Sequence, residues 1–137
     1  MVHFDESYLT ISYDADAAAV IMQWKSFATS EEFRKGLDEG LKLIEEKNAS
    51  NWLADLRKME AIDPEDEQWS NENWFPRALQ GGINRMAIVP SEDIFNSISV
   101  DNIMNAVGGT DLVTHYFKDT EEAKSWLKEQ QTELATK

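Results

Sequence analysis

The alternation of strand-type and helix-type apolar patterns constrains the fold of this chain more than any other feature of the sequence. Residues 7–14 alternate apolar and polar side chains, which is typical of a half-exposed strand, and residues 17–24 form a more buried strand-like run. Together they predict an antiparallel hairpin. Helical and strand-type segments then alternate to the end of the chain, in the order β-β-α-β-α-β-α-β-α. This order predicts an α/β fold with a mixed five-stranded sheet, parallel in its later part, and helices packed on it.

The first predicted helix, residues 29–47, has the clearest start. Thr29 and Glu32 have the spacing of a capping box, and apolar residues follow at helical spacing. The other predicted helices are residues 63–81, 99–109 and 119–131, and the later strands are residues 51–59, 85–89 and 112–117. With 137 residues, the chain is expected to form a single domain over residues 1–137.

The charge balance limits the partners that the protein can have. The chain carries 26 acidic and 13 basic residues, a formal net charge of −13. Such a field repels phosphate backbones and anionic membrane surfaces, so we expect no nucleic-acid partner. No apolar stretch approaches the roughly 18 residues of a membrane span, so no stable membrane insertion is expected. The start of the chain lacks a signal-peptide pattern and cysteine is absent, which together favour a cytoplasmic location.

The residues that usually carry catalysis are scarce. The two histidines, His3 and His115, are not at metal-ligand spacing, and without cysteine we expect no metal site. The paired glycines match neither a P-loop nor a dinucleotide fingerprint, so no cofactor is expected. No catalytic residue can be assigned, and we expect a protein that is not an enzyme. The remaining enzyme hypothesis uses Asp55 or Asp63 as a base.

The segment "WLADLRKMEAIDPEDEQW", residues 52–69, resembles the central stretch of the STAS domain, the fold of bacterial anti-sigma-factor antagonists. In that family a strand ends in Asp-Leu, and an Asp-Ser-Ser/Thr-Gly pattern opens the next helix, with the two aspartates eight residues apart. Here Asp55 and Asp63 are eight residues apart. The patterns "DLRK", "WFPRA" and a final "YF" before a "WL" helix are similar to a group of bacterial STAS-like or CRAL-TRIO-like proteins without established activity. The resemblance implies a STAS-like protein-interaction or regulatory module.

The sequence departs from the family pattern where the family carries its phosphorylated serine. That position falls on Pro64 or Glu65, and neither has a hydroxyl group. Switching by phosphorylation is therefore not available here. Glu65 either imitates a constant negative charge or is an ordinary acid in the first turn of a helix, where the helix dipole favours it.

The segment "EQWSNENWFPRALQGG", residues 67–82, does not fit one continuous α-helix. If Phe75, Ala78 and Leu79 face the core, Trp69 and Trp74 lie roughly 120° to one side and roughly 100° to the other. Pro76 also lacks the N–H group that a helix interior needs. These conflicts predict a break, with Asn73 capping a second helix.

Two interpretations of this segment stay open. Either both tryptophans pack in the core, or at least one lines a binding groove at the carboxyl end of the sheet. On the second interpretation the candidate binding residues are Asp55, Asp63, Glu65, Trp69, Trp74 and Arg77. The partner is then another protein, or a small apolar ligand or lipid held in a groove beside the bent Trp69–Trp74 segment. The opening hairpin leaves an edge strand that can pair, so a homodimer is also plausible.

Overall fold

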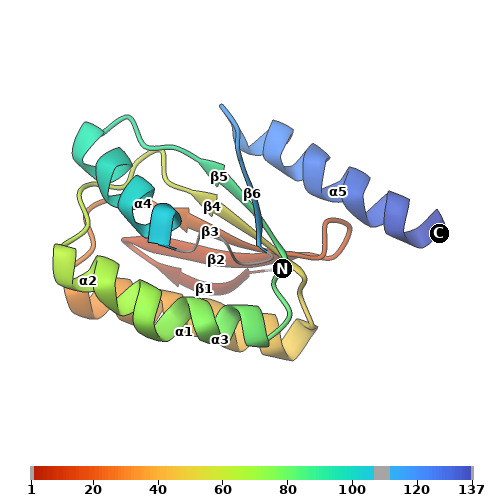
Figure 1. Ribbon diagram of the computed structural model, residues 1–137, viewed down its shortest axis with the longest axis horizontal. Coiled ribbons are helices and arrows are strands. Elements are labelled where there is room, and N and C mark those ends of the chain that lie inside the picture. Colours follow the sequence, from red (N-terminus) through yellow and green to blue (C-terminus); the bar gives the residue numbers. More distant parts are fainter. Residues whose placement is uncertain (1, 107–111, 137) are drawn as a thin grey trace.

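The computed structural model describes residues 2–106 and 112–136. Its centre is a six-stranded sheet in which the strands follow the chain order. The strands are β1 Val2–Glu6, β2 Leu9–Asp14, β3 Ala19–Trp24, β4 Asn51–Asp55, β5 Arg85–Val89 and β6 Val113–Tyr116. β1, β2 and β3 pair antiparallel, and β3 to β6 pair parallel. The predicted α/β fold with a mixed sheet is confirmed (Figure 1).

The sheet has one strand more than predicted. β1 pairs with β2, for example Phe4 with Ile11, and its register shifts between Val2 and Phe4. Phe4 packs against the core, whereas Asp5 and Glu6 beside it are exposed. The apolar alternation of this strand is too weak to be recognised, because it lies at the edge of the sheet.

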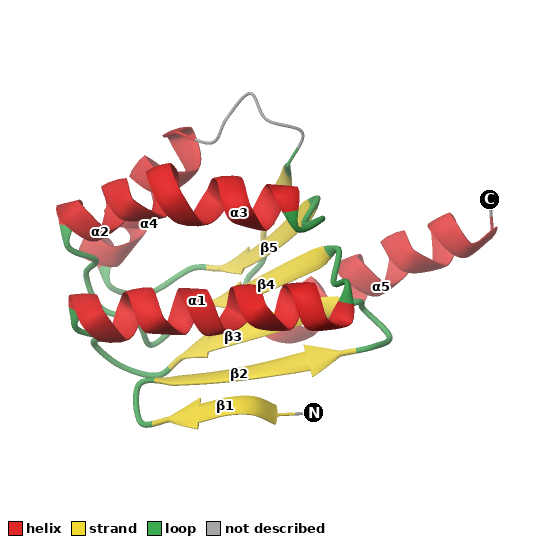
Figure 2. Cartoon of the chain, turned by 90° about the horizontal axis from the view of Figure 1, so that it is seen from below, coloured by secondary structure: helices red, strands yellow, loops and turns green. Residues whose placement is uncertain are grey.

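The helices divide unequally between the two faces of the sheet. They are α1 Ser30–Lys47, α2 Pro64–Trp69, the π-helical turn η1 Ser70–Trp74, α3 Phe75–Gln80, α4 Ile94–Ala106 and α5 Thr120–Thr136. α1 to α4 cover one face, with α2 and α3 lying between α1 and α4, and α5 lies on the other face (Figure 2). The connections from β3 to β6 all advance in one direction, so right-handed crossovers place their helices on the same face.

α1 begins as predicted and lies unusually close to the sheet. The Thr29 side chain accepts from the Glu32 N–H, and the Glu32 side chain accepts from the Thr29 N–H, which completes the capping box. A Cβ atom at Gly36 would lie 2.5 Å from Leu9, and one at Gly40 would lie 2.5 Å from Trp52. Only glycine allows this approach, so the two glycines let the helix rest directly on core side chains of the sheet.

The predicted break at Asn73 is wrong. α2, η1 and α3 follow one another without an interruption, and Asn73 lies inside the π-helical turn. The N–H of Phe75 donates to the carbonyl of Ser70, five residues back. A π turn holds one residue more than an α turn, so Trp74 is turned back by about 100° relative to a regular helix. The extra residue therefore brings Trp69 and Trp74 toward one side, and Pro76 is accommodated just after the widened turn.

α4 begins at Ile94, five residues before the predicted start at Ser99. Asp93 caps it, because its carboxylate accepts from the N–H groups of Phe95 and Asn96. The glycine pair predicted to end this helix lies outside the described residues.

Candidate functional site

The residues predicted to bind a partner come from the end of β4 and from the helical run that follows it. Asp55 closes β4 at the carboxyl edge of the parallel strands, and Asp63 caps α2. They line two separate surface depressions. Asp55 lines a polar one with Gln23 and Lys58, and Asp63 lines another with Phe27.

Asp55 is buried and fully engaged by a neighbour. Arg57 donates two hydrogen bonds to it, from Nε to Oδ1 at 3.0 Å and from Nη2 to Oδ2 at 2.9 Å. The hydrogen bonds from this guanidinium raise the pKa of Arg57. A bidentate pair of this kind fixes both side chains. Asp55 is therefore held as part of an ion pair at the carboxyl edge of the sheet.

Asp63 and Glu65 form the exposed start of α2. The Asp63 carboxylate accepts from the Glu65 N–H at 3.0 Å, and Pro64 occupies the first helical position. The first turn also carries Asp66 and Glu67, so negative charge accumulates at the positive end of the helix dipole. Both candidate residues remain at the surface, next to each other.

Asp66 is the residue at this site that sequence reasoning missed. It is buried, and it accepts from Ser30 Oγ at 2.7 Å and from Arg34 Nε at 2.9 Å. The Arg34 guanidinium in turn lies 5.4 Å from the ring centroid of Trp69. The available signal was the i, i+4 spacing of Ser30 and Arg34, which places a hydroxyl and a cation on one side of α1. Trp69 is half-buried beneath this cluster.

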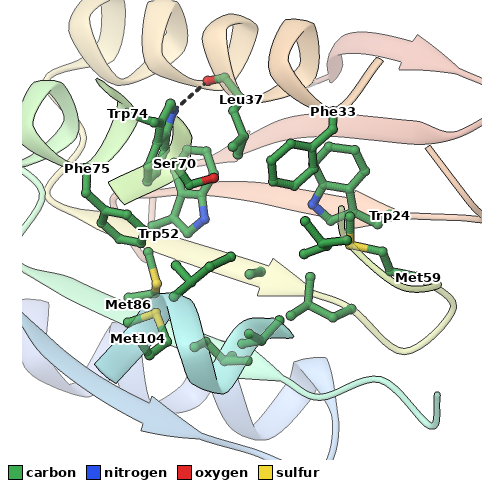
Figure 3. Close-up of a pocket in the computed structure, with 16 residues that line it drawn as sticks. Trp24, Phe33, Leu37, Trp52, Met59, Ser70, Trp74, Phe75, Met86 and Met104 are labelled. Carbon is green, nitrogen blue, oxygen red and sulfur yellow. Dashed lines mark hydrogen bonds between the residues drawn. The ribbon is translucent and has the colours of Figure 1, made fainter. Parts of the chain in front are cut away.

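Trp74 and Arg77 do not form a shared surface. Trp74 is only 1% exposed, and its Nε1–H donates to the carbonyl of Leu37 at 2.8 Å (Figure 3). Arg77 is exposed, and its Nη2 donates to Asp38 at 2.8 Å. The interpretation that places both residues on one binding surface is therefore wrong. Trp74 points into the core, and Arg77 contacts Asp38 on the exposed side of α1.

Trp74 lines a small apolar cavity between the helices and the sheet. The cavity volume is about 70 Å³. Three tryptophans, three methionines and several aliphatic residues are among those that surround it (Figure 3). The one hydroxyl among the lining residues, that of Ser70, donates to the Asp66 carbonyl. Trp52 and Trp74 meet in its wall with ring centroids 4.7 Å apart. The cavity wall therefore offers mainly apolar contact.

Within residues 2–106 and 112–136, no group of three histidine or acidic side chains could hold a metal ion. None of the helices in this part of the chain is both long enough and apolar enough to cross a membrane.

Comparison with known proteins identifies the family. A comparison with curated proteins found no match. The family model described as SpoIIAA-like matches residues 19–128. The match begins with β3 and extends into α5, so it includes every parallel strand and the helices between them. The predicted STAS-like, anti-sigma-factor antagonist-like fold is confirmed, and the chain belongs to the SpoIIAA-like family.

Proposed function

We propose that the protein is a cytoplasmic, non-enzymatic regulatory module that binds another protein without phosphorylation at the start of α2. Membership of the SpoIIAA-like family indicates a regulatory protein-interaction module. The observation that carries the rest of the proposal is the chemistry of residues 63 to 65. Asp63, Pro64 and Glu65 offer no hydroxyl group where the STAS pattern places its serine.

The neighbouring hydroxyl does not replace the missing serine. Ser70 is the one serine between Asp63 and Gln80. It is 2% exposed, and its hydroxyl donates to the Asp66 carbonyl at 2.9 Å. A kinase would have to unfold η1 to reach it. The start of α2 is instead a fixed, exposed acidic surface, which favours recognition by shape and charge.

The non-enzymatic part of the proposal rests on how the two candidate bases are used. Asp55 is paired with Arg57, and Asp63 caps α2. A general base must be free to accept a proton from a substrate within hydrogen-bond reach. Both carboxylates already accept hydrogen bonds that hold local structure.

The experiment captures a partner from a lysate of the source cells with the tagged full chain, and then measures the affinity of the purified partner. We expect an intact mass without a phosphoryl group and an affinity that phosphatase treatment leaves unchanged. Glu65→Arg reverses a charge on the proposed surface and is expected to weaken binding about tenfold or more, as charge reversal at interfaces does. The matched control is Glu46→Arg, which reverses an exposed charge near the C-terminal end of α1.

Three results would contradict the proposal. One is a phosphoryl group on the protein whose removal changes the affinity. Another is equal binding by wild type and Glu65→Arg, which would place the partner elsewhere. The third is the absence of any captured protein.

The second candidate function is the binding of a small apolar molecule in the cavity beside Trp74. Its supporting observation is the apolar wall of that cavity. The volume of about 70 Å³ is less than half of the roughly 150 Å³ of an engineered cavity that binds benzene. The ligand in this candidate is therefore far smaller than a lipid chain. Native mass spectrometry of freshly purified protein tests it: a retained mass that Ala54→Val displaces would support it, and a bare protein would count against it.

A further inference from the structure

The first half of α4 buries polar side chains and exposes apolar ones. Asn96 is 0% exposed and Ser99 is 6% exposed, whereas Ile94 and Phe95 are each 67% exposed and Ile98 is 51% exposed. A surface helix of a folded domain normally buries its apolar side chains and exposes its polar ones. Ile94, Phe95 and Ile98 are neighbours on the helix surface at spacings of three and four residues. We call these three residues the α4 patch.

Hydrogen bonds, rather than apolar burial, fix this half of the helix. Asn96 Nδ2 donates to the carbonyl of Glu60 at 2.7 Å, and Ser99 Oγ donates to the carbonyl of Ile62 at 3.2 Å. Just before the helix, Ser91 Oγ donates to the carbonyl of Met59 at 2.7 Å. The three contacts attach α4 to the loop between β4 and α2. The orientation that exposes the α4 patch is therefore built into the fold.

Exposure of the α4 patch has no stabilising role within the chain. Contiguous exposed apolar residues of this size reduce solubility and usually mark an interaction site. Farther along the same helix, Val100 and Ile103 are buried in the core. The two halves of α4 thus present apolar residues to opposite sides.

The charge around the α4 patch indicates the chemistry of its partner. No lysine or arginine occurs in residues 59–76 or in residues 86–117. Glu60, whose carbonyl accepts a hydrogen bond from Asn96, and Asp101 on α4 are both exposed, whereas Glu92 shares a depression with Arg57 and Lys58. An apolar surface with acidic surroundings is complementary to a segment that combines apolar and basic side chains. The net charge of −13 opposes both a second copy of the chain and an anionic lipid surface.

We propose that the α4 patch and the acids around it bind a cationic amphipathic helix of a partner protein. The inference rests on the proposed function and adds to the start of α2 a second contact surface, together with the chemistry of the partner. Apolar side chains of the helix cover Ile94, Phe95 and Ile98, and its basic side chains lie against Glu60 and Asp101.

The test titrates the full chain with a synthetic 18-residue lysine–leucine peptide whose leucines recur at helical spacing (about five turns at 3.6 residues each). A peptide of the same composition in scrambled order, which has no apolar face, is the comparison. Isothermal titration at moderate salt measures both. We expect the amphipathic peptide to bind at least about tenfold more tightly than the scrambled one, because only it can cover the patch. Phe95→Ser with Ile98→Ser is expected to remove this preference.

The matched control is Val113→Ser, which removes an exposed apolar side chain on β6 and should leave binding unchanged. Both variants change exposed residues, and far-ultraviolet circular dichroism verifies that each is folded. Equal binding of the two peptides, or no binding of either, would overturn the inference. Binding to anionic vesicles, or self-association, that disappears in the double variant would overturn it in favour of a lipid or a second copy.

The capture experiment separates this inference from the proposed function. A natural partner that binds Phe95→Ser with Ile98→Ser as tightly as wild type would contradict the α4 patch and leave the regulatory module standing. Loss of that partner in the double variant, with retention in Val113→Ser, would support both.

Discussion

Trp69 and Trp74 are five residues apart and have different roles that their positions in the chain do not reveal. Trp74 is buried, donates its N–H to the Leu37 carbonyl and packs edge-on against Trp52. Trp69 is half-buried and lies under the Arg34 guanidinium. Trp74 ties the helical run to the backbone of α1, and Trp69 supports the Arg34–Asp66 ion pair from beneath. Their contributions to stability should differ accordingly.

Trp74→Phe is expected to lower the free energy of unfolding by about 2 kcal/mol, because a hydrogen bond and part of the packed ring are lost. Trp69→Phe is the matched control and should cost less than about 1 kcal/mol, since it weakens an exposed cation–π contact. Urea unfolding measures both. Equal effects of the two substitutions would contradict the roles assigned to them.

Glu39 makes the free energy of unfolding depend on pH in the acidic range. The ammonium of Lys42 donates a hydrogen bond to it at 3.0 Å, which lowers the pKa of Glu39 below its usual 4.5. A lowered folded pKa adds stability that is fully present above the unfolded value and is lost as pH falls through the folded value. The stability difference between wild type and Glu39→Gln should therefore shrink as the pH falls below about 4.5. Urea unfolding across this pH range checks the sign, and a difference that grows on acidification would contradict it.

Among the elements, helices α1 and α2, which begin with a local capping signal, were predicted at the right residue. The capping box of α1 and the Asp63–Pro64 start of α2 are local signals, and both helices begin there. η1 was not predicted, because the hydrogen bond that positions its Trp74 is made to Leu37 in α1, far away in the chain, and no local pattern encodes that contact. The early start of α4 was missed for a related reason. Its buried residues Asn96 and Ser99 are polar, so the first half of α4 lacks the spacing of buried apolar residues that predicts a helix.

The same limit applies to the candidate site. Asp63 was placed correctly at a helix start, whereas the strand predicted for residues 51–59 ends earlier, at Asp55. Burial of Trp74 and Asp66 depends on partners more than thirty residues away in α1, at Leu37 and Arg34. Such long-range contacts leave no periodic signal in the sequence.

Deletion of Asn73 tests the role of the π-helical turn. The deletion removes the one residue by which a π turn exceeds an α turn, so α3 keeps its orientation relative to α2 while η1 becomes a regular α turn. Pro76 then lies in the interior of a regular helix, where its ring crowds the carbonyl four residues earlier, so we expect a loss of about 3 kcal/mol. Pro76→Ala is the control and should change stability by less than about 1 kcal/mol, because the turn already accommodates a missing N–H. A deletion variant as stable as Pro76→Ala would show that η1 is dispensable.

At the scale of the whole molecule, the excess of acids sets the response to salt. The acidic side chains that give the formal net charge of −13 repel one another across the fold. Each surface ion pair, by contrast, contributes little to the free energy of unfolding. Raising the sodium chloride concentration from about 0.02 M to about 0.3 M shortens the Debye length to a few ångströms and should raise the urea midpoint. A midpoint that falls with salt would mean that attractive pairs such as Arg34 with Asp66 outweigh the repulsion.

The central claim is that this SpoIIAA-like domain binds its partner without a phosphate switch. The most direct measurement is the dissociation constant of the captured partner, determined with the protein as isolated from its source cells and again after phosphatase treatment. We expect the same constant in both samples, because residues 63 to 65 carry no hydroxyl and Ser70 is buried. A constant that changes on treatment, together with a phosphoryl group on this chain, would contradict it.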